Sequence, residues 1–439
     1  MRKLFGTDGI RGIANEYPLT VDFCLRLAKA LTLKFCNFAE KKSSVIIGKD
    51  TRISGDMLTH SLAATFCAEG IDVTLLGVVP TPAVSILTRE LEASVGIMIT
   101  ASHNPFHDNG IKLFAGSGLK LLDSEETELE KIIADNPHSR KVMTSDFGKV
   151  EHIPSLLNIY CTKIKNSSNF KGFCKIVVDC ANGSFSAIAP GLLREFGFEV
   201  ISIHDSPNGI NINENCGAAN PYALREAVLH YGADLGIAFD GDGDRVVLAD
   251  EYGNFLDGDH ILAILVQSEL NKEVVSTIMS NLGLEKYLAS IGVKLSRSAV
   301  GDRYISEYMR NSDAQLGAEP SGHVIVKSHA STGDGLFAAL KVLEYLVKSG
   351  RTCSQLRFFE PYPTVSRDLR VQDKSILQNP VVQRVIQKLE KRLDGCGKLV
   401  IRPSGTESII RIWIEGENTM ELEKMADELS LVILDFIVE

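Results

Sequence analysis

The sequence lacks the features of a membrane-spanning or nucleic-acid-binding protein. Its apolar runs, such as residues 261–266 and 431–438, are far shorter than the roughly 20 residues that cross a bilayer. The amino-terminal residues 1–11 contain no apolar signal core. The formal net charge of −10 argues against bulk attraction to nucleic acid or to an anionic membrane. We therefore expect neither partner, and an anionic substrate would have to be attracted by local basic loops.

The cysteines also lack an organised pattern. None of the nine cysteines forms a C-x-x-C pair, so the sequence supports neither a zinc ribbon nor a dithiol redox motif. They are odd in number and scattered through apolar segments, which predicts reduced, packed thiols and a cytoplasmic location.

The length and the order of secondary-structure signals indicate several α/β domains. A chain of 439 residues exceeds one ordinary hydrophobic core. Strands of the first three units are predicted at residues 45–48, 73–76, 95–99, 175–180, 200–203, 234–239, 274–280, 294–299 and 315–318. In each unit a strand leads into a polar loop with Gly or Ser and then a helix. This pattern predicts three open α/β domains with functional loops at the strand ends.

The last part of the chain predicts a different, smaller α+β domain. Its expected strands and helices are residues 364–370, 398–401 and 409–415, and residues 379–392 and 419–432. The predicted domains are therefore residues 1–152, 153–254, 255–362 and 363–439.

The most informative segment is Asp240-Gly-Asp-Gly-Asp-Arg245, which follows a predicted buried strand. Glycine accepts backbone angles that other residues avoid, so a tight turn can direct the three carboxylates to one point. Three negative charges at such short separation are stable only when a cation lies between them. Ligand sets made only of oxygen favour Mg²⁺ or Ca²⁺. The segment therefore predicts a metal site formed by Asp240, Asp242 and Asp244.

Two alternatives compete with this interpretation. A Ca²⁺-binding EF-hand would place its twelfth ligand at Glu251, but Arg245 stands where that loop needs glycine, and the flanking segments predict strands rather than helices. The other alternative is a solvated acidic turn that binds no metal.

A second motif, Thr100-Ala-Ser-His-Asn-Pro105, follows the predicted strand 95–99. A serine at the carboxyl end of a strand lies in the crevice where open α/β sheets bind ligands. The motif lacks the G-x-S-x-G elbow of acyl transfer, and a plain turn is the competing interpretation. Beside a Mg²⁺ loop, however, Ser102 is better interpreted as a serine that carries a phosphoryl group.

Two further motifs follow predicted strands. Arg402-Pro-Ser-Gly-Thr-Glu407, with Arg411 nearby, combines hydroxyls, exposed N–H groups and guanidinium groups, as a phosphate cradle requires. The other motif is Glu319-Pro-Ser-Gly-His323. Its Glu319 and Ser321 are able to form hydrogen bonds with sugar hydroxyls, and its His323 is able to transfer a proton. A polar hairpin and a structural histidine are the respective alternatives.

Four basic loops complete the set of candidates, and each is also compatible with ordinary surface polarity. They are residues 5–11, 48–52, 110–112 and 300–303.

Together, these motifs resemble the four active-site loops of the α-D-phosphohexomutases, in the same order and at similar distances, and the resemblance covers essentially the whole chain. It implies a heart-shaped, four-domain protein with a central cleft and a C-terminal domain of the TBP-like α+β type. The segments 5–12 and 300–304 and the length resemble most the amino-sugar branch of the family. Pro320 and Ser408 depart from the usual motifs and leave a hexose-phosphate branch as the alternative.

The resemblance implies a role for each matched residue. Ser102 would be the phosphoserine and, with Asp240, Asp242 and Asp244, would hold one Mg²⁺. The remaining catalytic candidates are Arg11, Lys112, His323 and Arg245. The candidates for substrate binding are Arg303, Glu319, Ser321, Arg402, Ser404, Gly405, Thr406 and Arg411.

The implied reaction moves a phosphate between the 6- and 1-hydroxyls of glucosamine. It requires phosphorylated Ser102 and passes through a hexosamine 1,6-bisphosphate, which also acts as activator. The expected partner is thus a small sugar phosphate, and the protein is expected to be a monomer or a homodimer.

Overall fold

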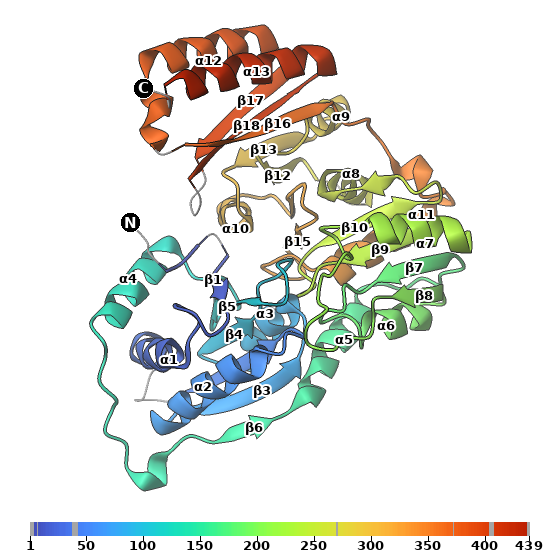
Figure 1. Cartoon of the computed structure of the whole chain (residues 1–439). Helices are drawn as coiled ribbons and strands as arrows, with labels where there is room; N and C mark the ends of the chain where they lie inside the picture. Colours follow the sequence, from blue (N-terminus) through green and yellow to red (C-terminus); the bar gives the residue numbers. More distant parts are fainter. Residues whose placement is uncertain are drawn as a thin grey trace.

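The computed structural model describes residues 4–6, 8–36, 43–268, 271–371, 373–403 and 408–436. Four sheets follow one another along this chain, each with its own helices (Figure 1). Short 3₁₀ helices lie at Thr144–Asp146, Pro154–Leu156, Ser354–Leu356 and Lys374–Gln378.

The first sheet has the strand order β1-β5-β4-β2-β3-β6. Its strands are β1 (Ile10–Ile13), β2 (Ser44–Lys49), β3 (Asp72–Val78), β4 (Val95–Ile99), β5 (Asp108–Ala115) and β6 (Val150–His152). The helices are α1 (Val21–Phe35), α2 (Gly55–Ala68), α3 (Thr81–Glu90) and α4 (Asp123–Ala134). Strand β2 is buried on both faces: Val45 and Ile47 join one apolar cluster, and Ile46 joins another. Burial on both faces is why β2 is a continuous apolar run.

The second and third sheets have the orders β11-β10-β9-β7-β8 and β13-β12-β14-β15. The second contains β7 (Lys175–Asp179), β8 (Glu199–Ile203), β9 (Leu235–Phe239), β10 (Val246–Asp250), β11 (Phe255–Leu256), α5 (Leu157–Asn166), α6 (Ala189–Glu195) and α7 (Tyr222–Tyr231). The third contains β12 (Glu273–Thr277), β13 (Lys294–Ser298), β14 (Leu316–Ala318), β15 (Val324–Val326), α8 (Gly258–Ser268), α9 (Leu282–Ser290), α10 (Asp302–Arg310) and α11 (Gly335–Ser349).

These three sheets repeat one arrangement. In each, two neighbouring parallel strands are extended by an antiparallel strand that follows the second of them: β2, β4 and β5; β7, β9 and β10; β12, β14 and β15. The three predicted motifs of the α/β units occupy the same turn of this arrangement, between β4 and β5, β9 and β10, and β14 and β15. The repeat therefore directs three loops of unrelated sequence to equivalent positions.

The C-terminal part is an antiparallel sheet with the order β16-β18-β17, covered by two helices (Figure 1). Its elements are β16 (Thr364–Arg370), α12 (Pro380–Leu393), β17 (Gly397–Pro403), β18 (Ile409–Gly416) and α13 (Thr419–Asp435). It has an apolar core of its own, in which Ile412 packs with Leu389 and Leu429. The predicted fold class, three α/β units and one α+β unit, is confirmed.

Several expectations meet a definite outcome in this fold. The Ca²⁺-binding EF-hand alternative is wrong, because antiparallel strands β9 and β10 flank Asp240–Arg245 where that motif needs helices. All nine cysteines are free thiols, and five of them are buried. Within the described ranges, none of the helices combines the length and the apolar character needed to cross a membrane. The domain boundaries at residues 152, 254 and 362 stay predictions.

Candidate active site

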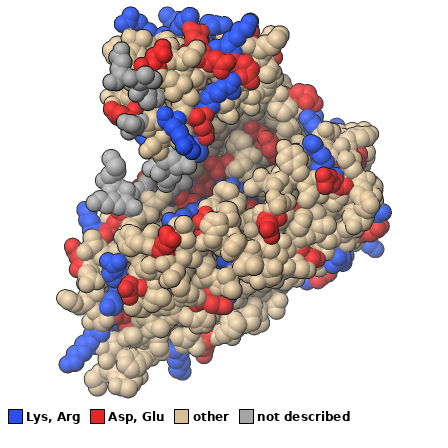
Figure 2. All heavy atoms as spheres, viewed as in Figure 1, with Lys and Arg blue, Asp and Glu red and all other residues tan. Residues whose placement is uncertain are grey.

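The loops of the first three sheets meet at the junction between their domains. Figure 2 shows the molecule hollowed beneath the C-terminal domain, with acidic side chains inside the hollow. Ser102, Asp240 and Asp242 are fully buried where the three loops meet, and Asp244 is nearly so. The sequence motifs thus lie together although more than a hundred residues separate them.

Ser102 contacts the aspartate loop directly. Its Oγ donates a hydrogen bond of 2.7 Å to Oδ2 of Asp240, and its own N–H donates to Oγ1 of Thr100 at 2.8 Å. The backbone of Ser102 is left-handed, with φ of 53°. Such a conformation is costly for a residue with a Cβ and is concentrated at functional sites, where the surroundings impose it.

Arg52 stabilises this backbone conformation by binding the carbonyl groups of the loop. Its Nη2 donates to the carbonyls of Ser102 (3.0 Å) and Asn104 (2.8 Å), and Nη1 donates to those of Asp108 and Pro105. Only 1% of Arg52 is exposed. The planar guanidinium, with five donors in a fixed fork, is suited to collecting several carbonyls of one loop.

Two more residues complete this support. Asp50 accepts hydrogen bonds from Nε of Arg52 (2.9 Å) and from Oγ1 of Thr100 (2.6 Å). Nδ2 of Asn213, in the second domain, donates to the carbonyls of Ser102 (2.9 Å) and Asn104 (3.0 Å). Sequence reasoning assigned residues 48–52 only to a basic loop and missed Asn213, since nothing in their local pattern marks such distant contacts.

The aspartate loop approaches the serine loop so closely that glycine is required. A Cβ on Gly241 would lie 2.8 Å from the carbonyl oxygen of Ser102, and Gly243 has a φ of 74°. Carboxylate oxygens of Asp240, Asp242 and Asp244 lie within 4.8 Å of one another. Burial, and then the charges of Asp244 and Asp242, raise the pKa of Asp240 well above its usual value.

This donor set fits a hard divalent cation. Among the described residues, Oδ1 of Asp242 and Oδ1 of Asp244 are buried with no hydrogen-bond donor. A buried carboxylate oxygen without a donor is costly, and a metal ion is one of the partners that removes this cost. Oxygen-only sites of this kind suit Mg²⁺, Mn²⁺ or Ca²⁺.

Lys112, on β5, balances part of this negative charge. Its Nζ lies 2.8 Å from Oδ2 of Asp242, 2.7 Å from Oδ2 of Asp244 and 2.9 Å from Oδ2 of Asp8, and the residue is 2% exposed. Burial alone would lower the pKa of Lys112, but Asp242, Asp244 and Asp8 hold it well above its usual value. Lys112 is therefore held as an ammonium group by the three carboxylates.

Arg11 and Arg245 contact the residues that flank Ser102. Arg11 donates to the carbonyl of Ala101 (3.2 Å) and to Oδ2 of Asp8 (2.6 Å), and Nη1 of Arg245 lies 3.1 Å from Nδ1 of His103. Burial, followed by the charges of Arg245 and Arg11, lowers the pKa of His103 to about 4. His103 is thus neutral near pH 7, and the two guanidinium groups supply the positive charge around the serine.

His323 is buried behind the aspartates. Its Nε2 lies 3.2 Å from Oδ2 of Asp302 and accepts from the N–H of Gly333 at 2.8 Å. Burial lowers the pKa of His323, but Asp302 and Asp244 raise it more, so the net shift is upward. The ring is accordingly enclosed by protein groups, among them the carboxylates of Asp302 and Asp244.

The remaining candidates of the third domain lie in two settings. Glu319 is half-buried and accepts from the N–H of Gly301 at 3.2 Å, whereas Ser321 is exposed. Arg303 is buried and points to helix α4, where it donates to both oxygens of Glu126 (2.8 and 2.5 Å) and to Asp123. Direct contact of Arg303 with a sugar stays a prediction.

The C-terminal domain contributes an arginine pair. Arg402 on β17 and Arg411 on β18 are direct cross-strand partners, both half-buried, and Nε of Arg411 lies 3.7 Å from Oδ2 of Asp368. Like charges placed opposite each other destabilise a sheet, and an anion between them would offset this cost. Ser404, Gly405 and Thr406 lie outside the described residues.

This combination defines the phosphohexomutase class. Three α/β domains bring together a serine, an aspartate trio and a Glu/His loop, and an α+β domain contributes paired arginines. The chain matches the four domains of one family, described as phosphoglucomutase/phosphomannomutase alpha/beta/alpha domains I, II and III and the C-terminal domain. The matches cover residues 2–140, 150–253, 257–362 and 368–432. The chain belongs to the phosphoglucomutase/phosphomannomutase family.

Similar proteins extend over almost the full length. A phosphoglucosamine mutase of Agrobacterium fabrum is 43% identical over 98% of both chains, and one of Gluconacetobacter diazotrophicus is 45% identical over 98% of this chain and 97% of its own. A phosphoglucomutase/phosphomannomutase family protein of Burkholderia thailandensis has a TM-score of 0.82 at 22% identity, covering 99% of this chain and 98% of its own. At this identity the structural likeness establishes the fold.

The buried pair of Arg303 and Glu126 predicts a large effect on stability. Arg303→Ala removes both guanidinium bonds to a buried carboxylate, which is expected to lower the free energy of unfolding by about 3 kcal/mol. Urea denaturation measures this value. Arg310→Ala, at an exposed position of the same helix, is the matched control and is expected to change stability by less than about 0.5 kcal/mol. Equal stabilities of the two variants would contradict the assignment.

Proposed function

We propose that the protein is a phosphoglucosamine mutase, which interconverts glucosamine 6-phosphate and glucosamine 1-phosphate. The proposal is supported by relatives of that name, 42–45% identical over nearly the whole chain. The observation that carries the chemistry is the hydrogen bond from Ser102 to Asp240 inside the aspartate trio. The glucosamine 1-phosphate that the enzyme forms would feed UDP-N-acetylglucosamine and cell-wall precursor synthesis in the cytoplasm. The protein would act as a monomer or homodimer.

Ser102, Asp240, Asp242 and Asp244 would hold one Mg²⁺ beside the reacting group. When bound, the ion neutralises charge on the transferring phosphoryl group, which is the main demand of phosphoryl transfer. Arg11 and Arg245 contribute further positive charge near Ser102. Lys112 already bridges Asp242 and Asp244, so its ammonium keeps the trio compact and partly neutralised.

The reaction proceeds through two transfers, because the 6- and 1-oxygens are too far apart for one step. In the first, the bond between phosphorus and Oγ of phosphorylated Ser102 breaks. A bond to the free sugar hydroxyl forms, and that hydroxyl loses its proton to a base. The product is glucosamine 1,6-bisphosphate. In the second, the other phosphate returns to Ser102, and the sugar oxygen that it leaves receives a proton.

Between the transfers, the bisphosphate must turn so that its other phosphate faces Ser102. Arg402 and Arg411, with Ser404, Gly405 and Thr406, would bind whichever phosphate does not react. Glu319, Ser321 and Arg303 would recognise the sugar. Lys112 and His323 would be the groups that exchange protons with the sugar hydroxyls. Added bisphosphate would activate protein that has lost its phosphoryl group.

A comparison of substrates tests the proposed sugar. Glucosamine 6-phosphate is expected to turn over with a higher kcat/KM than mannose 6-phosphate or glucose 6-phosphate, in assays with Mg²⁺ and a trace of bisphosphate. Faster turnover of either hexose phosphate would instead assign the chain to the hexose-phosphate branch of the family.

Ser102→Ala is expected to abolish turnover while the protein keeps its fold, because the group that carries the phosphoryl is gone. Steady-state isomerisation and intact-mass analysis measure turnover and the bound phosphate, and circular dichroism monitors the fold. Ser117→Ala, at an exposed position of the same domain, is the control and is expected to retain both. Isomerisation by Ser102→Ala near the unsubstituted rate would refute the assignment.

Arg52 is expected to act as a positioning residue. Arg52→Lys leaves a positive charge but cannot bond four carbonyls at once. It is expected to slow phosphoryl transfer from Ser102 on the order of 10²-fold with little change in KM. Single-turnover transfer to glucosamine 6-phosphate measures this step. Arg89→Lys, at an exposed position, is the control. A fall in thermal stability with an unchanged transfer rate would show that Arg52 has only a structural role.

A further inference from the structure

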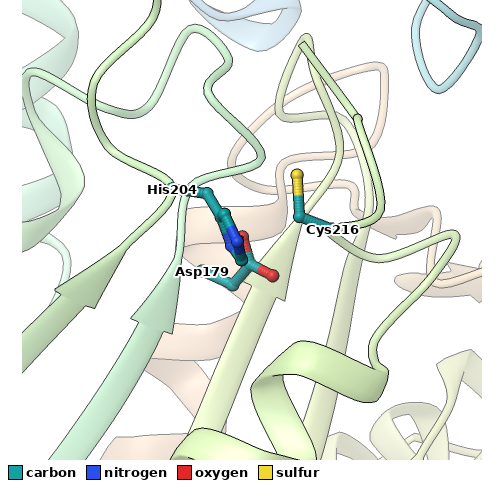
Figure 3. A group of neighbouring side chains, drawn as sticks. All are labelled: Asp179, His204 and Cys216. Carbon is teal, nitrogen blue, oxygen red and sulfur yellow. The ribbon is translucent and has the colours of Figure 1, made fainter. Parts of the chain in front are cut away.

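A second cluster of metal-ligating side chains lies in the second domain, apart from the aspartate trio. Asp179 is the last residue of β7, His204 follows β8, and Cys216 lies in the loop before α7 (Figure 3). One ligand atom from each lies within 4.8 Å of the other two. Asp179 and Cys216 are buried. The carboxyl ends of two parallel strands and one loop thus bring together an oxygen, a nitrogen and a sulfur donor.

The carboxylate of Asp179 is fixed but not saturated. Its Oδ1 accepts from the N–H of Ala181 (2.9 Å) and faces Nδ1 of His204 at 3.1 Å, and Oδ2 accepts from the N–H of Gly217 (2.9 Å). A carboxylate has about four lone-pair positions, so capacity for another partner is left. The backbone bonds therefore orient Asp179 without excluding a metal ion.

His204 holds its position at a conformational cost. Its φ is 45°, in the left-handed region that favours glycine, and 32% of its side chain is exposed. Residues held in such conformations are concentrated at functional sites. Asp179 and Cys216 are buried, whereas the imidazole of His204 is partly exposed. Solvent and an ion therefore reach the cluster past His204.

We propose that Asp179, His204 and Cys216 form a site for a thiophilic divalent cation of the Zn²⁺ type. Thiolate, imidazole and carboxylate are the donors that Zn²⁺ prefers, whereas the oxygen-only trio of Asp240, Asp242 and Asp244 suits Mg²⁺. Three protein ligands leave the fourth tetrahedral position to water. When the ion binds, the thiol of Cys216 releases its proton to solvent. The hydrogen bond between the imidazole of His204 and the carboxylate of Asp179 is broken.

The site would stiffen the segment that supports Ser102. Asn213, between His204 and Cys216 in the chain, donates to the carbonyls of Ser102 and Asn104. The carbonyl of Gly209, in the same segment, accepts from the N–H of Ile53 at 2.9 Å. A cation that links β7, β8 and Cys216 would restrain both ends of this segment. We therefore expect the loaded protein to be more resistant to heat.

Cobalt(II) reports directly on the sulfur ligand. The full-length protein is freed of metal by chelation, kept reduced, given saturating Mg²⁺ to occupy the aspartate trio, and titrated with Co²⁺. One equivalent is expected to produce a thiolate-to-cobalt absorption band in the near ultraviolet, which oxygen ligands alone do not give. Zn²⁺ is then expected to remove the band by competition.

Two variants assign the ligands. Cys216→Ser and His204→Gly are each expected to lose the band and to weaken Zn²⁺ binding at least about tenfold. Glycine suits the left-handed backbone at residue 204, so that variant is expected to fold normally. Cys353→Ser, at another buried thiol, and His138→Gly, at an exposed loop histidine, are the controls and are expected to keep the band. Absence of the band from the unsubstituted protein, or its persistence in either ligand variant, would overturn the proposal.

A thermal measurement checks the second consequence. One equivalent of Zn²⁺, added with Mg²⁺ present, is expected to raise the Tm of the unsubstituted protein and leave that of Cys216→Ser unchanged. Equal shifts in both proteins would contradict the site.

Discussion

The structure depends on the burial of opposite charges at the junction of three domains. Asp8, Lys112 and Lys120 come from the first domain, the aspartate trio from the second, and Asp302, the ion-pair partner of Lys120, from the third. Unpaired charges at these buried positions would be prohibitively costly, so each domain supplies the counter-charges of its neighbours. The candidate active site and the contacts between the domains are therefore the same set of interactions.

A repeated backbone arrangement brings these charges together. The turn between β4 and β5 carries Ser102, the turn between β9 and β10 carries the trio, and the turn between β14 and β15 carries Glu319 and His323. Each turn joins a buried parallel strand to an antiparallel neighbour, so the loops are short and held at both ends. The C-terminal domain differs, because it has a separate core, and it contributes Arg402 and Arg411 from a β-hairpin.

The sequence predicted the parts of this site that depend on local pattern. Apolar runs ending in Gly-, Ser- or Asp-rich loops mark β4 and β9, and the alternation of glycine and aspartate indicates a turn that gathers carboxylates. Strands β1 and β5 interrupt their apolar residues with charged and glycine positions such as Arg11, Gly12 and Lys112, so the sequence pattern does not predict them. The roles of Arg52 and Asn213 depend on carbonyls far away in the chain, and residues 110–112 were compatible with a surface loop although Lys112 is buried. The pairing of Arg303 with Glu126 of α4 likewise depends on residues far apart in the chain, and the local pattern does not show it.

The central claim is that the buried trio, next to the serine hydroxyl, is a divalent-cation site. Anomalous diffraction from crystals soaked with Mn²⁺ tests it most directly, because this ion scatters anomalously and accepts the same oxygen ligands as Mg²⁺. The account predicts one strong peak bonded to Asp240, Asp242 and Asp244 and next to Oγ of Ser102 or its phosphate. A trio without a peak, with Lys112 still bridging Asp242 and Asp244 at saturating Mn²⁺, would contradict it.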